Sequence, residues 1–150
     1  MPAPLLLDLS HTSHTHARTG IQRVARSLWR ELGPRAEAIT YDPHQRTWRP
    51  LQPWETKNLS TDSFSSKRSA AWPLTAKLRG HSRRLLPGPA LHSPLAPRHS
   101  PLFFPEVFSP AVAAALPALF AAHSGPRAAL FHDAIALKFP ELTPPKTVAR

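Results

Sequence analysis

The sequence contains no cysteine among its 150 residues. This absence excludes disulfide frameworks, cysteine-ligated zinc, iron–sulfur clusters and cysteine nucleophiles. Glycine is scarce too, and the five glycines, at positions 20, 33, 80, 88 and 125, cannot form a G-x-G-x-x-G fingerprint. Neither a Walker A loop nor a G-x-S-x-G elbow occurs. The signatures of dinucleotide-binding, P-loop and α/β-hydrolase enzymes are therefore missing.

Long hydrophobic runs are also absent, and acidic residues are few. The longest apolar run, residues 111–122, is interrupted by Pro117 and is shorter than the roughly 20 residues that cross a bilayer. The run at residues 5–7 ends at Asp8 and has no basic start, unlike a signal peptide. Nine acidic residues stand against 19 basic ones, a net charge of +10. We expect a soluble chain, or one attached to a membrane surface.

Composition divides the chain into three parts. Residues 1–54 and 101–150 carry periodic apolar patterns, whereas residues 55–100 are rich in proline, serine and basic side chains. Between Lys57 and Ser100 the sequence has eight basic residues and one acid, Asp62. We interpret residues 55–100 as a basic insertion, disordered or loosely helical, within a partial Rossmann-like domain formed by the two flanking parts.

The first part alternates between strand and helix patterns. Residues 5–9 form an apolar run suited to a buried strand, and residues 38–41 and 47–51 are further strand candidates. A helix begins with the T-x-x-Q capping box at Thr19, places its basic side chains opposite its apolar ones, and ends at Gly33.

The last part repeats this alternation. Residues 102–104 and 128–131 predict buried strands. The helix between them begins at Ser109-Pro110, and we expect it to be bent or split near Pro117. Strand–helix–strand alternation predicts an α/β fold with a Rossmann-like parallel sheet.

Two places put functional groups at the carboxyl ends of the strands, where ligands of open parallel sheets bind. The first runs from Asp8 to Thr19 and Gly20, at a helix N-terminus that can attract an anion. The alternative is that Gly20 only permits the turn. The second is His132-Asp133, where the histidine can bind a sugar hydroxyl or carry a proton. The alternative there is a hydrogen-bonded core histidine and an aspartate that caps a turn.

The histidines at positions 11, 14 and 16 could ligate a metal, but no acid beyond Asp8 accompanies them, so a polar loop is the stronger interpretation and we expect no metal.

The segments LLLDLS (residues 5–10) and TGIQRVAR (residues 19–26) resemble the opening of bacterial glycosyltransferases of the retaining GT-B type, glycosyltransferase family 4 or group 1. The segment FHDAIALKFPE (residues 131–141) is similar to their HD-x-I-P-L-x-x-P-E motif. The resemblance covers residues 4–52 and 101–150.

This resemblance implies a cytoplasmic enzyme of polysaccharide biosynthesis that transfers a sugar from a nucleotide-sugar donor to a saccharide or lipid-linked acceptor. His132 and Asp133 would be catalytic, and Asp8, Thr19, Gly20 and Arg23 would bind substrate. No further cofactor is implied. A single glycine stands where many relatives have a pair, and no two glutamates have the E-x7-E spacing of the second domain. We therefore interpret the chain as the incomplete N-terminal, acceptor-side half, inactive by itself, without the nucleotide-sugar domain.

A second hypothesis, which rests on charge, is a non-enzymatic basic module that binds an anionic membrane or nucleic acid. Residues 73–86 can form a basic amphipathic helix, with leucines at positions 74, 78 and 85 on one face. Residues 67–86 would then bind an anionic membrane at its inner face, or else form a solvated loop. The tryptophans are too widely spread for nucleic-acid stacking, so no specific nucleic acid is expected.

Overall fold

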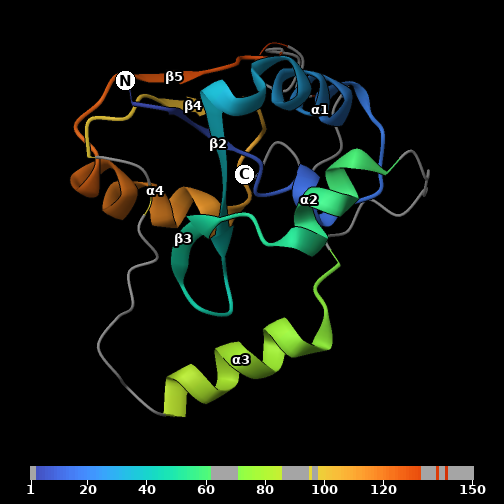
Figure 1. The fold of residues 1–150 in the computed structure, drawn as a ribbon, viewed down its shortest axis with the longest axis vertical. Coiled ribbons are helices and arrows are strands. Elements are labelled where there is room, and N and C mark those ends of the chain that lie inside the picture. Colours follow the sequence, from blue (N-terminus) through green and yellow to red (C-terminus); the bar gives the residue numbers. More distant parts are fainter. Residues whose placement is uncertain are drawn as a thin grey trace.

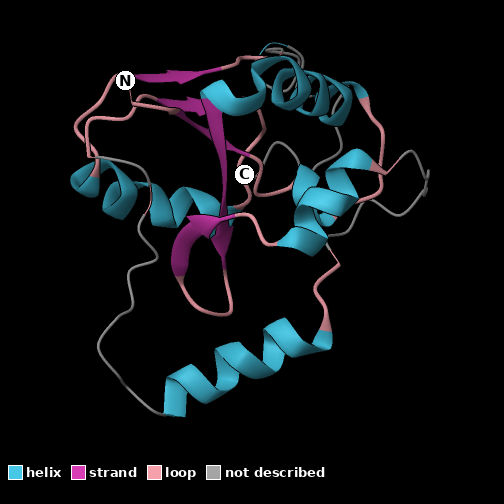
Figure 2. Ribbon diagram, in the orientation of Figure 1, coloured by secondary structure: helices cyan, strands magenta, loops and turns pink. Residues whose placement is uncertain are grey.

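A computed structural model describes residues 3–61, 71–85 and 98–132, together with Leu95, Lys138 and Glu141. Helices cover both faces of a central sheet, which confirms the α/β class (Figure 2). The strands are β1 (Leu5–Asp8), β2 (Ala36–Asp42), β3 (Thr47–Pro50), β4 (Leu102–Phe104) and β5 (Arg127–Ala129). The α-helices are α1 (Gly20–Leu32), α2 (Pro53–Ser60), α3 (Leu74–Leu85) and α4 (Pro110–Ala122), with short 3-10 turns at Thr12–His14 and Gly33–Arg35.

The five strands are arranged in the order β3-β2-β1-β4-β5. β1 pairs in parallel with β2 on one side and with β4 on the other, and β4 pairs in parallel with β5. β3 is antiparallel to β2, so the sheet is mixed but mostly parallel, and the predicted parallel sheet is confirmed for β1, β2, β4 and β5 alone. Residues 43–46 alone join β2 and β3, and a connection this short permits only a hairpin.

Two apolar clusters lie on opposite faces of the sheet. On one face Leu7 and Leu9 pack with Ala25 of α1 and Leu59 of α2. On the other, α4 packs against inward-facing strand residues; this cluster comprises Leu6, Ile39, Trp48, Leu102, Phe104, Val112 and Leu119. Figure 1 shows α4 on one side of the strands and α1 and α2 on the other. Successive residues of β1 thus face opposite layers, as strand geometry requires.

Helix α1 begins and ends where the sequence predicts. Thr19 and Gln22 form the capping box, and Gly33 follows the last turn with a φ of +49° that favours glycine. The assignment of its faces was partly wrong. Val24, placed on the apolar face, is exposed, whereas Arg26, placed on the polar face, is buried. The loop before α1 covers Arg26, which donates to the carbonyl of Thr15 at 2.8 Å.

The last part of the chain departs from expectation in two ways. α4 is one helix that contains Pro117, so of the expected bend or split at this residue the split does not occur. Among the described residues the last strand is Arg127–Ala129 rather than residues 128–131, and all three of its residues are exposed. The expectation of a buried strand was therefore wrong, because β5 is the edge of the sheet and Leu130 and Phe131 are exposed beyond it.

The folded unit continues beyond residue 54. α2 includes residues 55–60, and its Glu55 and Leu59 are fully buried. α3 confirms the helix predicted within the basic segment, and in Figure 1 it lies beyond the β2–β3 hairpin, away from the other helices. Within the residues that the structure describes, no helix has the length and apolar character needed to cross a bilayer.

Two glycines offer a matched test of packing. A Cβ at Gly125 would lie 2.5 Å from the carbonyl oxygen of His99 and against that of Ser100, whereas a Cβ at Gly20 would meet no atom within 4 Å. We expect Gly125→Ala to lower the free energy of unfolding by about 1–3 kcal/mol, and Gly20→Ala to leave it unchanged or slightly raised. Urea denaturation of both variants measures the difference, and equal stability would contradict the close approach at Gly125.

Candidate functional site

The centre of the sheet forms a topological switch point. From β1, the chain crosses through α1 to β2 on one side, while β4 lies on the other side of β1. Loops that leave neighbouring parallel strands in opposite directions open a crevice at their carboxyl ends, and ligands of open α/β sheets bind there. Asp8, the last residue of β1, and Glu106, two residues after β4, stand at this crevice.

Asp8 is almost fully buried. Its Oδ1 accepts hydrogen bonds from the backbone N–H of Ser10 at 3.0 Å and from the Ser10 hydroxyl at 2.5 Å. Burial and the neighbouring charge of Glu106 raise the pKa of Asp8 to about 7, against the lowering effect of the Ser10 hydrogen bonds. Near neutral pH this carboxyl can therefore either accept or donate a hydrogen bond.

Glu106 joins the end of β4 to the loop after β1. Its carboxylate accepts from the backbone N–H groups of His11 and Thr12, each at 2.9 Å, and from the Thr12 hydroxyl. Burial raises the pKa of Glu106, while these hydrogen bonds oppose the rise. Because both carboxyl oxygens hold backbone of the opposite loop, Glu106 fixes the shape of the crevice.

A cavity of about 160 Å³ lies at this crevice. Asp8, Ser10 and His11 line it from β1 and its loop, and Glu106 lines it from the other side. Its remaining lining residues are Tyr41, Pro43, Trp72, Val107, Ser109, Ala111 and Val112. A second cavity of about 190 Å³ lies beside the N-terminus of α1 and shares His11, Glu106, Val107 and Ser109 with the first. Carboxyl, hydroxyl and aromatic groups thus converge on one small space.

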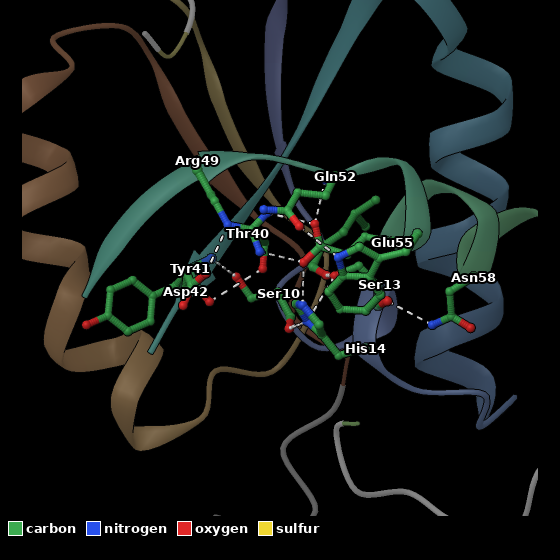
Figure 3. Close-up of polar contacts among 12 residues, drawn as sticks. Ser10, Ser13, His14, Thr40, Tyr41, Asp42, Arg49, Gln52, Glu55 and Asn58 are labelled. Atoms are coloured by element: carbon green, nitrogen blue, oxygen red, sulfur yellow. Dashed lines mark hydrogen bonds and ion pairs between the residues drawn. The ribbon is translucent and has the colours of Figure 1, made fainter. Parts of the chain in front are cut away.

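Next to the crevice lies a buried ion-pair network, drawn in Figure 3. Arg49 donates to both oxygens of Glu55 at 2.7 Å and to Asp42 at 3.1 Å. Burial by itself would raise the pKa of Glu55, but hydrogen bonds from Arg49, His14 and the backbone N–H of Gln52 lower it to about 2. The carboxylate is therefore ionised at every physiological pH.

His14 is enclosed in the same network. Its Nε2 lies 2.6 Å from Glu55, and its Nδ1 lies 2.8 Å from the carbonyl oxygen of Ser10. The two ring nitrogens thus face a carboxylate and a carbonyl oxygen. The ring also stacks on Trp72, with centroids 3.9 Å apart. His14 thereby couples the loop after β1 to α2 and to the segment before α3.

The sequence-predicted site residues are only partly brought together. Asp8 lines the cavity, and Gly20 is exposed at the start of α1 with open space around it. Thr19 serves as the helix cap. Arg23 is exposed and does not line either of these two cavities.

His132 lies beyond the edge strand β5, and its Nε2 donates to the carbonyl oxygen of Pro105 at 2.7 Å. Pro105 precedes Glu106, so His132 contacts the loop after β4 rather than the cavity. Asp133 lies outside the described residues. Among the described residues, no group of three histidines or acids is placed to hold a metal ion.

Sequence reasoning missed Glu106 and the Arg49–Glu55 pair. Glu106 could have been found, because it follows a predicted strand at the same edge of the sheet as Asp8. Glu55 is 6 positions from Arg49 and 41 positions from His14. No local sequence pattern predicts these contacts.

The raised pKa of Asp8 predicts a specific pH dependence of stability. The unfolded chain releases this proton near the ordinary value of 3.8, whereas the folded protein holds it until about 7. Between these values the folded state binds more protons, so a stabilising contribution present below pH 3.8 is lost as the pH rises, by roughly 1.4 kcal/mol per pH unit.

Asp8→Asn removes this titration. We expect the stability of the variant relative to the wild type to increase from pH 4 to pH 7.5, as measured by urea unfolding. Glu31→Gln, which changes an exposed carboxyl on α1, serves as the control and should show no such trend. A difference between Asp8→Asn and wild type that stays constant with pH would contradict the assignment.

No known protein family, no curated protein and no solved structure matches this chain. The chemistry of the crevice is therefore the basis on which a function can be argued.

Proposed function

We propose that this chain is the acceptor-side part of a retaining glycosyltransferase of the GT-B type. The observation that carries the proposal is the cavity at the switch point, where the buried carboxyl of Asp8 meets the hydroxyl of Ser10 and the rings of Tyr41 and Trp72. The resemblance of residues 5–10, 19–26 and 131–141 to family 4 glycosyltransferases supports the same conclusion.

The lining of this cavity suits a saccharide. Sugar hydroxyls donate to carboxylates and accept from hydroxyls, while the C–H face of a sugar ring packs on aromatic side chains. Pockets for drug-sized ligands measure roughly 300–1,000 Å³, so a cavity of about 160 Å³ suits one small ring. We assign Asp8 the binding of an acceptor hydroxyl, and Glu106 the positioning of the loop that carries Ser10 and His11.

The remaining roles follow from the resemblance. Thr19 and Gly20 would face a donor phosphate at the N-terminus of α1, with Arg23 nearby on the same helix, and His132 and Asp133 would contact the transferred sugar. The nucleotide-sugar donor would bind to a second domain. The enzyme would act in the cytoplasm in polysaccharide biosynthesis, on a saccharide or lipid-linked acceptor.

Saccharide binding tests the proposal directly. We expect saccharides titrated into the chain to shift backbone NMR signals of Ser10, Tyr41 and Val107, which line the cavity. Asp8→Asn removes a carboxylate acceptor and should weaken this binding about tenfold, as the loss of one hydrogen bond to a charged group predicts. Thr56→Ala, on the exposed face of α2, is the control and should bind normally.

Two results would contradict the proposal. One is the absence of saturable shifts at the cavity with any saccharide tested. The other is sugar transfer from a nucleotide sugar by the 150-residue chain alone, because the proposal assigns the donor site to another domain.

A second candidate function, attachment to an anionic membrane surface, is favoured by the exposure of α3. Leu74 and Leu78 are 70% and 60% exposed, one turn apart on this helix. Residues 74–85 contain four basic side chains and no acid. Apolar side chains exposed beside basic ones are typical of helices that lie in a membrane interface. A lipid-linked acceptor would be reached from such a surface.

Co-sedimentation with vesicles tests this candidate. We expect binding to anionic vesicles that weakens with salt, is absent with neutral vesicles, and disappears on deletion of residues 67–86. Leu74→Ser/Leu78→Ser should reduce binding strongly, because it removes the exposed apolar contacts and leaves the charge. Binding that is unaffected by the deletion would contradict a role for this helix.

A further inference from the structure

The switch-point cavity has two acids in its wall. Asp8 and Glu106 both line it, and they are only 1% and 5% exposed. His14 lowers the pKa of Asp8 and Arg26 lowers that of Glu106, but neither of these side chains lines the cavity. No lysine or arginine of the described residues lines it either. A ligand in this cavity therefore meets buried negative charge.

Asp8 brings an unused acceptor oxygen to the cavity. The hydrogen bonds that it accepts within the described part of the chain, from the N–H and the hydroxyl of Ser10, both end on Oδ1, so Oδ2 has no donor there. Some unpartnered polar atoms of the described chain are wholly enclosed, such as Oδ1 of Asn58, but Oδ2 of Asp8 is not among them. This oxygen therefore opens on the cavity that Asp8 lines. Because a buried acceptor without a donor is costly, a ligand that donates to Oδ2 is favoured.

Glu106 offers a second acceptor that is held in place. Its Oε2 accepts only the N–H of His11 among the described residues, so one lone pair of this oxygen remains. Val107, which also lines the cavity, is 66% exposed, so a ligand can enter from the surface at this residue. A protonated amine has three N–H donors and carries the charge that two buried carboxyls attract.

The charge of the whole chain acts in the opposite direction. The net charge is +10, so non-specific attraction favours anions over cations. A larger cavity, of about 390 Å³, lies between α2 and the start of α3 and is lined by Trp54, Lys57 and Trp72, with no acid among its described lining residues. A preference for a cation is therefore expected at the switch point and not at this larger cavity.

We propose that the saccharide bound at the switch-point cavity is an amino sugar with a free amino group. Its protonated amine would donate to Oδ2 of Asp8 and face the carboxylate of Glu106, and the hydroxyl beside the amine would use the second lone pair of Oδ2. The inference rests on the proposed function, which places a saccharide in this cavity, and it adds the class of that saccharide.

Three ligands with the same ring test the role of the amine. Glucosamine carries a free amine, N-acetylglucosamine carries the same nitrogen without charge, and glucose has a hydroxyl at that position. In NMR titrations of the intact chain at pH 6, we expect glucosamine to shift the signals of Ser10 and Val107 and to bind at least tenfold more tightly than the other two. Equal saturable binding of all three would overturn this inference and leave the proposed function standing, whereas binding of no saccharide would contradict the proposed function itself.

Two further observations separate an amino sugar from other amines and other places. 2-Aminoethanol has the same neighbouring amine and hydroxyl without the ring, and it should bind at least tenfold more weakly than glucosamine. Equally tight binding would overturn the inference, because the site would then recognise an ammonium group alone. The signals of Trp54 and Asn58 report on the larger cavity, and shifts confined to these two residues would overturn it as well.

Variants test the two carboxyls. Asp8→Asn preserves the size of the side chain and removes its charge, so glucosamine should bind to this variant no more tightly than N-acetylglucosamine does. Glu31→Gln, which changes an exposed carboxyl on α1, should keep the preference. Glu106→Gln removes the second charge but places an amide near the N–H groups that Glu106 holds, so its fold is checked by circular dichroism. If it does not fold, Asp8→Asn still decides, and a preference that persists in Asp8→Asn would overturn the inference.

Proton release gives an independent measurement. Burial and Glu106 raise the pKa of Asp8 to about 7, while Ser10 and His14 oppose the rise, so this carboxyl is largely protonated at pH 6. An ion pair with an ammonium group requires the carboxylate, so we expect glucosamine to release a proton on binding and glucose to release none. Calorimetric titration at pH 6 in two buffers that differ in ionisation enthalpy measures the release. Binding of glucosamine without proton release would overturn the proposed pairing.

Discussion

The carboxylate of Glu106 joins the two strand ends on which the crevice depends. It holds the backbone N–H groups of His11 and Thr12, which belong to the loop after β1, while Glu106 itself follows β4. These bonds are made where water is excluded, and a buried N–H group left without a partner would be costly. The same carboxylate contributes to the raised pKa of Asp8. One side chain thus shapes the site and adds to the effect of burial, the larger cause of the raised pKa of Asp8.

A second buried charge cluster lies next to the crevice. Glu55 binds Arg49 with both oxygens and His14 with one of them, so it joins β3, α2 and the 3-10 turn after β1. Removing one partner from a buried ion pair typically costs about 3–5 kcal/mol, because the remaining charge is left uncompensated. Trp72 stacks on His14 and also contacts Trp54 and His44 edge to face.

Local signals in the sequence predicted the elements better than their assembly. The capping box at Thr19 and the Ser109-Pro110 start marked α1 and α4 correctly, because caps depend only on neighbouring residues. The antiparallel β3, the exposed edge strand β5 and the burial of Arg26 depend on contacts between distant segments. The site shows the same division. The rule that ligands bind at the carboxyl ends of parallel strands identified Asp8 and could have identified Glu106. No rule of residue spacing joins His14 to Glu55.

The two cavities differ in the charge that they would accept. Two buried carboxyls border the switch-point cavity, and an anionic ligand there would add to the repulsion that already raises the pKa of Asp8. A neutral ligand rich in hydroxyl groups avoids this repulsion. The cation of Lys57 instead borders the cavity of about 390 Å³ that Trp54 and Trp72 line. Trp72 lines both cavities, yet its stacking on His14, which Glu55 holds, resists movement of the ring. The two cavities thus differ in the charge along their borders, although Trp72 lines both.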